Sequence, residues 1–327
     1  MSAPHPSGLT VGQRLLRALH DAHERWRPAP THGPAWQPDA TGAAANALIR
    51  ARLDSGAPTL IGRFGASELE AMLRYLAVKD ERPWRAQVRY LRGLAPPPWL
   101  DAGFLADMEM FSGLFPRSAD VIARFSQLLL ADMRLIDILG SWLPGDRDMV
   151  RRGVTAARIP LADLEPYLHE NPWSQALHGR SVLVIHPFAD LIESQYARRT
   201  RLFRDPTVLP EFELQTMTAV MSLTGSRVAF PDWFAALDSM IERVRTLRFD
   251  VAIIGAGAYG LPLAAAVKRL GKQAVHLGGA TQILFGIRGN RWDAMPEFQR
   301  LFTDAWVRPG EHHRPPRWQD TEDGCYW

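Results

Sequence analysis

The chain has 327 residues, of which 46% are hydrophobic and 22% charged, and its formal net charge is +3. This composition is ordinary for a globular protein with one large domain or two smaller ones. It excludes several classes: the lone Cys325 rules out internal disulfides and cysteine-clustered metal sites, and no apolar run reaches the about 18 residues of a membrane span. No signal peptide and no dense basic run with interleaved aromatics is found, so we expect a cytoplasmic protein without a nucleic-acid partner.

The chain divides by composition into three parts. Residues 1–45 are expected to form an appendage, with one helix at residues 11–26 and a Pro-rich stretch at residues 28–38. An α/β domain is expected over residues 46–290. Residues 291–327 form an aromatic, Pro-rich tail that we expect to pack on this domain.

The first half of the domain carries more helix than strand signals. Helices are expected at residues 43–53 and 66–76, with a short strand at residues 59–63 between them. Residues 101–139 have helical apolar spacing, and the polar residues 145–153 indicate a loop or hinge.

The second half alternates between strand and helix signals. Strands are expected at residues 180–187, 213–221, 249–254 and 272–276, and helices at residues 188–204, 231–247 and 261–271. This alternation predicts a mostly parallel sheet flanked by helices, the Rossmann-like α/β class.

The strongest single motif is G-x-G-x-x-G at Gly255, Gly257 and Gly260, which includes Tyr259 and joins a buried strand to a helix. Glycines at these places let the backbone approach a diphosphate, and the start of the helix offers free N–H groups. The alternative is a strand-to-helix turn that binds nothing.

The strand that follows this motif argues against a dinucleotide. NAD enzymes usually end that strand in an acidic residue that binds the ribose. Here the strand ends in His276, and no acidic residue occurs between Gly260 and Asp293. NAD is therefore not expected as a cofactor.

A second candidate segment begins at Arg63, where a strand turns into a helix. Arg63 could pair with a diphosphate, and Glu68 could bind a divalent metal ion. The structural alternative is that Ser67 and Glu70 form a capping box and Glu68 occupies a favourable first helical turn.

Further candidates lie at strand ends and in a glycine-rich loop. His186 and His276 each end a strand, and Asp190 follows His186 closely, so each could act as a base or bind phosphate, or simply satisfy the local structure. His312 and His313 are expected to be solvated. The loop at residues 278–292 has the composition of a binding loop, and its candidate ligand-binding residues are Gly278, Gly279, Thr281, Gln282, Arg288 and Arg291.

Four segments together resemble the bacterial GT-D-type glycosyltransferase-domain family, many members of which are uncharacterised. They are residues 61–69, the His-Pro-Phe run at 186–188, the glycine turn at 255–260 and the loop at 278–292. The resemblance covers roughly residues 45–327, and the terminal Gly-Cys-Tyr-Trp at 324–327 is similar to one branch of the family.

The resemblance implies a Rossmann-like GT-D fold that binds a nucleotide sugar, commonly UDP-linked, and transfers the sugar. Characterised members carry an Arg-x-Gly-Asp-Gly-Glu segment whose D-x-E pair binds a divalent metal ion. The matching positions are Arg63, Gly65 and Glu68, but Ala66 stands at the aspartate position. This departure removes one of the two expected ligands, so dependence on Mn²⁺ or Mg²⁺ stays open.

We therefore interpret the chain as a glycosyltransferase that uses a UDP-sugar or another nucleotide-diphosphate sugar and an unidentified acceptor, in cell-surface polysaccharide or glycoconjugate synthesis. Candidate catalytic residues are Glu68, Asp190 and His186, in that order. One alternative is a catalytically silent nucleotide-sugar-binding or partner-binding protein of the same fold. A second is an NAD(P)-dependent oxidoreductase. The sequence leaves open whether the chain forms a homo-oligomer.

Overall fold

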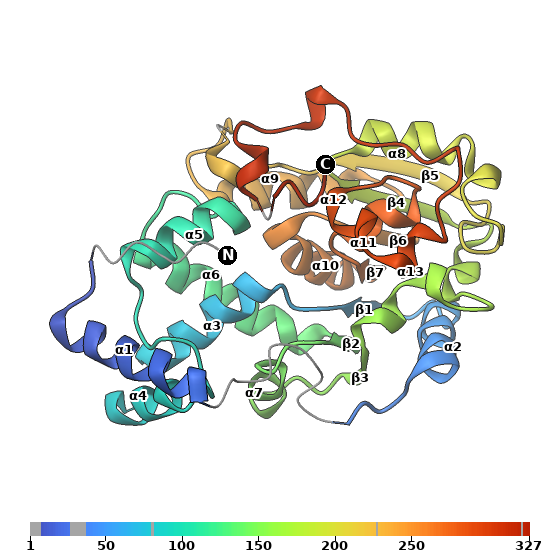
Figure 1. Ribbon diagram of the computed structural model, residues 1–327. Coiled ribbons are helices and arrows are strands. Elements are labelled where there is room, and N and C mark those ends of the chain that lie inside the picture. The colour runs from blue at the N-terminus through green and yellow to red at the C-terminus, as the bar shows by residue number, and fades with distance from the viewer. Residues whose placement is uncertain (1–7, 27–36, 80–81, 227, 322) are drawn as a thin grey trace.

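The computed structural model describes residues 8–26, 37–79, 82–226, 228–321 and 323–327. Within these residues, seven strands form one sheet in the order β3-β2-β1-β7-β6-β4-β5, and every pairing is parallel. The expected α/β class with a parallel sheet is confirmed (Figure 1). The strands are β1 (Thr59–Gly62), β2 (Ile138–Ser141), β3 (Ala157–Pro160), β4 (Ser181–His186), β5 (Glu213–Thr218), β6 (Val251–Ile254) and β7 (Gln273–His276).

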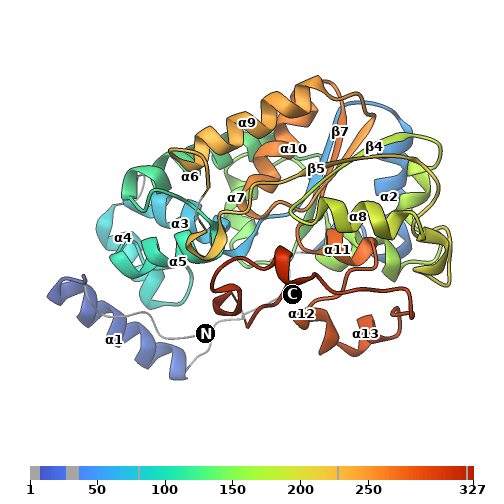
Figure 2. The ribbon, with the colours of Figure 1, turned by 90° about the horizontal axis from the view of Figure 1, so that it is seen from above.

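Helices cover both faces of this sheet, as the two views show (Figures 1 and 2). Short 3-10 turns occur between them. The α-helices are α1 (Val11–Trp26), α2 (Gly42–Asp54), α3 (Ala66–Lys79), α4 (Pro83–Leu91), α5 (Ala102–Ser112), α6 (Ala119–Asp132), α7 (Asp146–Arg151), α8 (Ala189–Tyr196), α9 (Trp233–Thr246), α10 (Gly260–Arg269), α11 (Ala280–Leu284), α12 (Asn290–Asp293) and α13 (Pro296–Gln299). None of the helices in the described ranges is long and apolar enough to cross a bilayer.

The central strands are apolar throughout because both of their faces are buried. In β6, Ala252 and Ile254 pack into the core under α3, α6, α9 and α10, whereas Val251 and Ile253 pack into the core under α2, α8 and α11. This alternation follows from the two-residue repeat of a strand, and the continuous apolar run is typical of a parallel sheet with helices on both faces.

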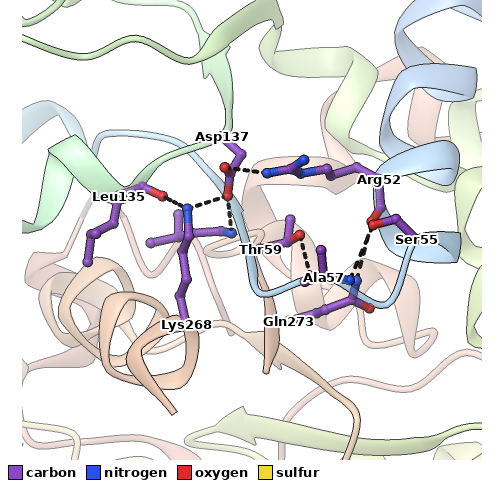
Figure 3. A network of polar contacts seen from close by, with 9 residues as sticks. Arg52, Ser55, Ala57, Thr59, Leu135, Asp137, Lys268 and Gln273 are labelled. Atoms are coloured by element: carbon purple, nitrogen blue, oxygen red, sulfur yellow. Dashed lines mark hydrogen bonds and ion pairs between the residues drawn. The ribbon is translucent and has the colours of Figure 1, made fainter. Parts of the chain in front are cut away.

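A polar network holds the amino-terminal ends of the central strands together (Figure 3). Asp137, just before β2, accepts hydrogen bonds from the Leu60 amide of β1 (2.8 Å), from Lys268 of α10 (2.6 Å) and from Arg52 of α2 (2.7 Å). Gln273, at the start of β7, donates to the Ala57 carbonyl at 3.0 Å. These bonds fix the end of the sheet opposite to the one where ligands bind in open α/β folds.

Most of the predicted elements are confirmed, but two predictions for residues 101–160 are wrong, and one strand there was missed. The helical spacing of residues 101–139 breaks into α5, α6 and then β2, because the apolar residues at 136–139 fit a helix face and a short buried strand equally well. The expected loop at 145–153 contains α7. Strand β3 was not predicted, since as an edge strand it includes Arg158 and is only partly buried. All of the Pro-rich stretch predicted at residues 28–38 except residues 37 and 38 lies outside the described residues.

Candidate functional site

The carboxyl ends of four neighbouring strands, β1, β7, β6 and β4, gather the predicted site segments at one edge of the sheet. The chain leaves β1 into α3 on one face and leaves β7 into α11 on the other; α10 after β6 and α8 after β4 are likewise on opposite faces. Crevices open where successive connections diverge in this way, and ligands of open α/β sheets bind there. The structure thus brings Arg63, His186, Gly255 and Gly278 close to one another.

Arg63 is a half-buried cation at the end of β1. Its guanidinium carbon lies 5.2 Å from the centre of the Trp142 ring, and the Trp142 indole in turn donates to the Phe64 carbonyl at 3.0 Å. On another side, Nη1 lies 3.6 Å from the position a Cβ on Gly278 would take. Among the described residues Arg63 has no ion pair, so its charge is held in place without being neutralised.

Three carboxyl groups lie within electrostatic range of Arg63. Burial raises the pKa of Glu68, of Asp146 and of Glu165, and the positive charge of Arg63 partly opposes each rise. The pKa of Glu165 is raised to about 7. Protonation of Glu165 therefore changes near neutral pH, in the range where a general acid or base is effective.

Glu68 folds back over Gly65, so that a Cβ at Gly65 would overlap its carboxylate. A hydrogen bond from its own backbone amide in the first turn of α3 lowers the pKa of Glu68 against the effect of burial. Gly65 is therefore required for this conformation. The contact fits the structural alternative, in which Glu68 stabilises the helix start, and it leaves the role in metal binding a prediction.

The three glycines of the turn have different surroundings. An ideal Cβ on Gly255 would lie 2.7 Å from the Gly278 carbonyl oxygen and from side-chain atoms of His186 and Thr281, and one on Gly260 would overlap the His276 ring. Gly257 has φ +51°, and nothing lies within 4 Å of its Cβ position. The outer two glycines thus serve internal close packing, and Gly257 is the member of the motif with open space for a ligand.

Both candidate histidines are buried, with 4% of the surface of each exposed. Burial lowers the pKa of His186 and of His276 to about 3, so both imidazoles are neutral at neutral pH. Nδ1 of His186 accepts a hydrogen bond from the Phe188 amide at 3.0 Å, and Nδ1 of His276 lies 3.3 Å from the Ile254 carbonyl. Neither ring supplies positive charge to a phosphate in this arrangement.

The loop at residues 278–292 is held by the polar side chains that were candidates for ligand binding. Thr281 and Gln282 are fully buried, and the Gln282 amide donates to the Arg288 carbonyl at 3.3 Å and to the Tyr326 carbonyl at 3.2 Å. Arg288 pairs with Asp293 at 3.0 Å. These contacts fasten the loop to the C-terminal segment.

Three other candidates also make contacts within the protein. The Arg291 guanidinium lies over the Tyr326 ring, and a Cβ on Gly279 would lie 2.8 Å from Cε1 of Tyr326. Tyr259 stacks on Trp233 at 4.6 Å, and its hydroxyl lies 3.1 Å from that of Ser222. Their observed contacts are structural, and their ligand-binding roles stay predictions.

Asp190 contacts two histidines of the C-terminal segment. His313, expected to be solvated, is buried, and its Nε2 lies 3.0 Å from Asp190, while Nε2 of the exposed His312 lies 3.5 Å from the same carboxylate. Nδ1 of His313 accepts from the Gly310 amide, so Nε2 carries the proton and donates to Asp190. A metal ion at this Nε2 would require a proton on Nδ1, facing the Gly310 amide hydrogen.

Consequently, His313 and Asp190 form a clamp between α8 and the C-terminal segment. Slight burial opposes ionisation of Asp190, but the hydrogen bonds from His313, from the Leu191 backbone amide and from His312 together outweigh it and lower the pKa of the carboxyl group. The clamp is reinforced by the buried Trp327, whose indole donates to the His313 carbonyl at 2.8 Å. In this structure Asp190 is the acceptor of an anchoring hydrogen bond from His313 rather than a base free to accept a proton.

Sequence reasoning missed three residues beside Arg63. Trp142 and Asp146 follow β2, and Glu165 follows β3, the two strands that were not predicted. Asp146 is fully buried; one oxygen accepts from the Ser141 hydroxyl and from two backbone amides, whereas Oδ1 has no partner among the described residues. These residues could have been recognised as polar residues that directly follow a strand. That recognition requires β2 and β3 to be predicted first.

Comparisons with known proteins add little to this geometry. No protein-family model matches the chain, and no curated protein matches it. Among solved structures, the chain is similar to a selenomethionine-substituted structure of domain of unknown function 1792, with a TM-score of 0.36 and 10% sequence identity. The alignment covers 90% of this chain and 100% of that one. At this level of similarity it does not distinguish one activity from another.

Proposed function

We propose that the chain is a glycosyltransferase that binds a nucleotide-diphosphate sugar, such as a UDP-sugar, at the carboxyl ends of β1, β7 and β6. The observation that carries this proposal is the guanidinium of Arg63, which lies between Trp142 and Gly278 and forms no ion pair with a described residue. A guanidinium pairs with a diphosphate through two parallel hydrogen bonds, and the open backbone at Gly257 offers room for the same group.

In the proposed reaction, the acceptor hydroxyl attacks the anomeric carbon of the sugar as the bond to the diphosphate oxygen breaks. The leaving diphosphate gains negative charge, and Arg63 is placed to stabilise it. The acceptor proton must pass to a base. Glu165, with a pKa of about 7, joins Glu68 as a candidate base, because near neutral pH its carboxyl group is ionised in about half of the protein molecules.

A divalent ion is a separate part of the proposal. Mg²⁺ in phosphate sites is often held by one or two carboxylates together with substrate phosphates and waters. Glu68 supplies one carboxylate, and Ala66 supplies none. We therefore expect Mn²⁺ or Mg²⁺ to bind with the donor rather than alone, with Arg63 providing most of the fixed positive charge.

Ala66 also favours a second candidate function, a catalytically silent protein that binds a nucleotide sugar. Turnover separates the two. The purified chain should be incubated with UDP-glucose, UDP-galactose, UDP-N-acetylglucosamine and GDP-mannose, with and without Mn²⁺, and release of the nucleoside diphosphate measured over a broad acceptor panel. Release supports the enzyme, whereas binding without any hydrolysis or transfer supports the silent protein. Binding of NAD without binding of UDP or GDP would overturn both and favour the oxidoreductase.

A further inference from the structure

Exposed apolar side chains are concentrated on two neighbouring helices at one end of the molecule. In the described part of the chain, ten large hydrophobic side chains are strongly exposed, and seven of them lie on α1, on α4 or just after α4. A concentration of exposed apolar side chains marks a binding surface more often than scattered single residues do. The seven are Val11, Leu15, Leu19, Trp26, Trp84, Val88 and Leu94.

Helix α1 touches the rest of the protein along one side only. Leu16 packs against Tyr90 of α4 and against Trp99, and His20 stacks on the same tyrosine ring at 4.2 Å. No residue of α1 is buried, and the Trp26 side chain is 93% exposed. The helix lies at the outside of the molecule beside α4, as Figures 1 and 2 show.

The exposed residues of α1 form a stripe. At about 100° per residue, Val11, Leu15, Leu19 and Trp26 fall within an arc of about 80°. Leu16 and His20 fall beside this arc, on the side turned to α4. The helix therefore has one apolar side that packs on the protein and another that no described residue covers.

Cationic side chains border this uncovered stripe. By the same spacing Arg14 and Arg25 lie along one edge of it, Asp21 lies next to Arg14 and farther from the stripe, and Glu24 lies on the opposite side of the helix. Both arginines bond to backbone carbonyls, of Leu9 and Asp21, so their charges are not neutralised by a carboxylate in the described structure. Arg85 and Arg92 add positive charge at α4.

We propose that α1, with the adjoining part of α4, binds the surface of an anionic lipid bilayer and lies in the plane of its headgroups. An apolar stripe bordered by arginines and containing tryptophan has the chemistry of an interfacial helix. Anionic headgroups attract the arginines, and the apolar side chains enter the boundary of the acyl region. A single stripe of four side chains offers much less than the about 800 Å² per partner of a stable protein interface, so a second copy of the chain is the less favoured occupant. This inference does not depend on the proposed glycosyl transfer.

The test uses the full chain and two kinds of vesicle, one of phosphatidylcholine and one containing phosphatidylglycerol. We expect co-sedimentation with the anionic vesicles, weakened by salt, and loss of about tenfold or more of this affinity in the Leu15→Glu/Leu19→Glu variant. Both leucines are exposed, so circular dichroism should show an unchanged fold. Leu270→Glu, which alters an exposed leucine at the end of α10, is the matched control and should bind as the unmodified chain does.

Equal binding by the Leu15→Glu/Leu19→Glu variant, or no binding to anionic vesicles, would overturn the proposal. Sedimentation velocity covers the remaining occupant. If the unmodified chain does not bind vesicles but forms a dimer, and the same variant is a monomer, the stripe would be assigned to a second copy of the chain.

Discussion

The guanidinium of Arg63 lies against the backbone of Gly278, with Nη1 3.6 Å from the position of a Cβ on that glycine. Gly278 has φ +61°, in the left-handed region that favours glycine. One residue at the end of β1 and another just after β7 thus meet at the carboxyl ends of these two paired strands. The proposed diphosphate site depends on this pair.

Gly278→Ala should weaken nucleotide binding beyond its effect on stability. The alanine is strained at positive φ, by about 1–2 kcal/mol, and its methyl group occupies space beside the guanidinium. Gly271→Ala is a matched control, since Gly271 has φ +77° and nothing within 4 Å of its Cβ position. Urea denaturation should show similar losses of stability for both variants, while calorimetry with UDP should show weaker binding for Gly278→Ala alone. Equal UDP affinities would remove Gly278 from the site.

Gly260→Ala should be more destabilising than Gly257→Ala. A Cβ at position 260 overlaps the buried His276 ring, and relieving such overpacking costs about 1–3 kcal/mol, in addition to lost close packing between α10 and β7. At position 257 the space is open and the cost is the backbone strain, about 1 kcal/mol. The free energies of unfolding should rank accordingly. The reverse order would contradict the close packing described between Gly260 and His276.

Glu165 should make folding less stable as the pH rises from about 4.5 to above 7. Burial raises the pKa of its carboxyl group from 4.5 to about 7 in the folded protein. Since the neutral form is the one favoured on folding, its contribution is present below pH 4.5 and is lost as the pH passes through 7. The loss is of order 3 kcal/mol at most.

The Glu165→Gln variant tests this dependence because the amide stays neutral and can still accept from the Tyr167 hydroxyl. Unfolding should be measured at pH 5 and pH 8 for both proteins. The difference in unfolding free energy between the variant and the unmodified chain should favour the variant more at pH 8 than at pH 5. Parallel pH profiles for the two proteins would contradict the raised pKa.

Asp190→Ala should loosen the C-terminal segment without disturbing the sheet. The substitution removes the acceptor for Nε2–H of His313 and leaves a buried donor unpaired, at a cost of about 1–3 kcal/mol. Hydrogen exchange should accelerate over residues 310–327 and stay unchanged in β4 and β6. Asp205→Ala, at an exposed carboxylate that bonds only locally to Thr207, serves as the control. Unchanged exchange in the segment would show that Asp190 does not anchor it.

The parts of the fold that the sequence predicted have local signals. Strands β1, β4, β6 and β7 are apolar runs that end at glycine, proline or histidine, and the helix start after Gly257 is marked by the glycine motif. Strand β2 has no such boundary, because Ile138 continues the apolar spacing of the preceding helix. The residues that follow it, Trp142 and Asp146, were missed for the same reason.

The burial of side chains could not be predicted from their own segments. Gln282 is enclosed because Tyr326, far along the chain, packs over the loop and accepts a hydrogen bond from its amide. The His276 ring is buried because Gly260 has no side chain in the space that the ring occupies. The parallel sheet predicted that several strand ends would meet near Arg63. The sequence could not predict which of the polar side chains there would lack a partner, because that depends on long-range packing.

The central claim is that Arg63 holds a diphosphate, and titration calorimetry with UDP on the unmodified chain and on Arg63→Ala tests it most directly. A lost pair of charge-assisted hydrogen bonds should weaken UDP binding by about tenfold or more. The effect on the unfolding midpoint should be smaller, because no described residue forms an ion pair with Arg63 and the loss there is its contact with Trp142. Arg204→Ala, which removes one exposed positive charge elsewhere, should bind UDP as the unmodified chain does. Equal dissociation constants for the unmodified chain and Arg63→Ala would contradict the account.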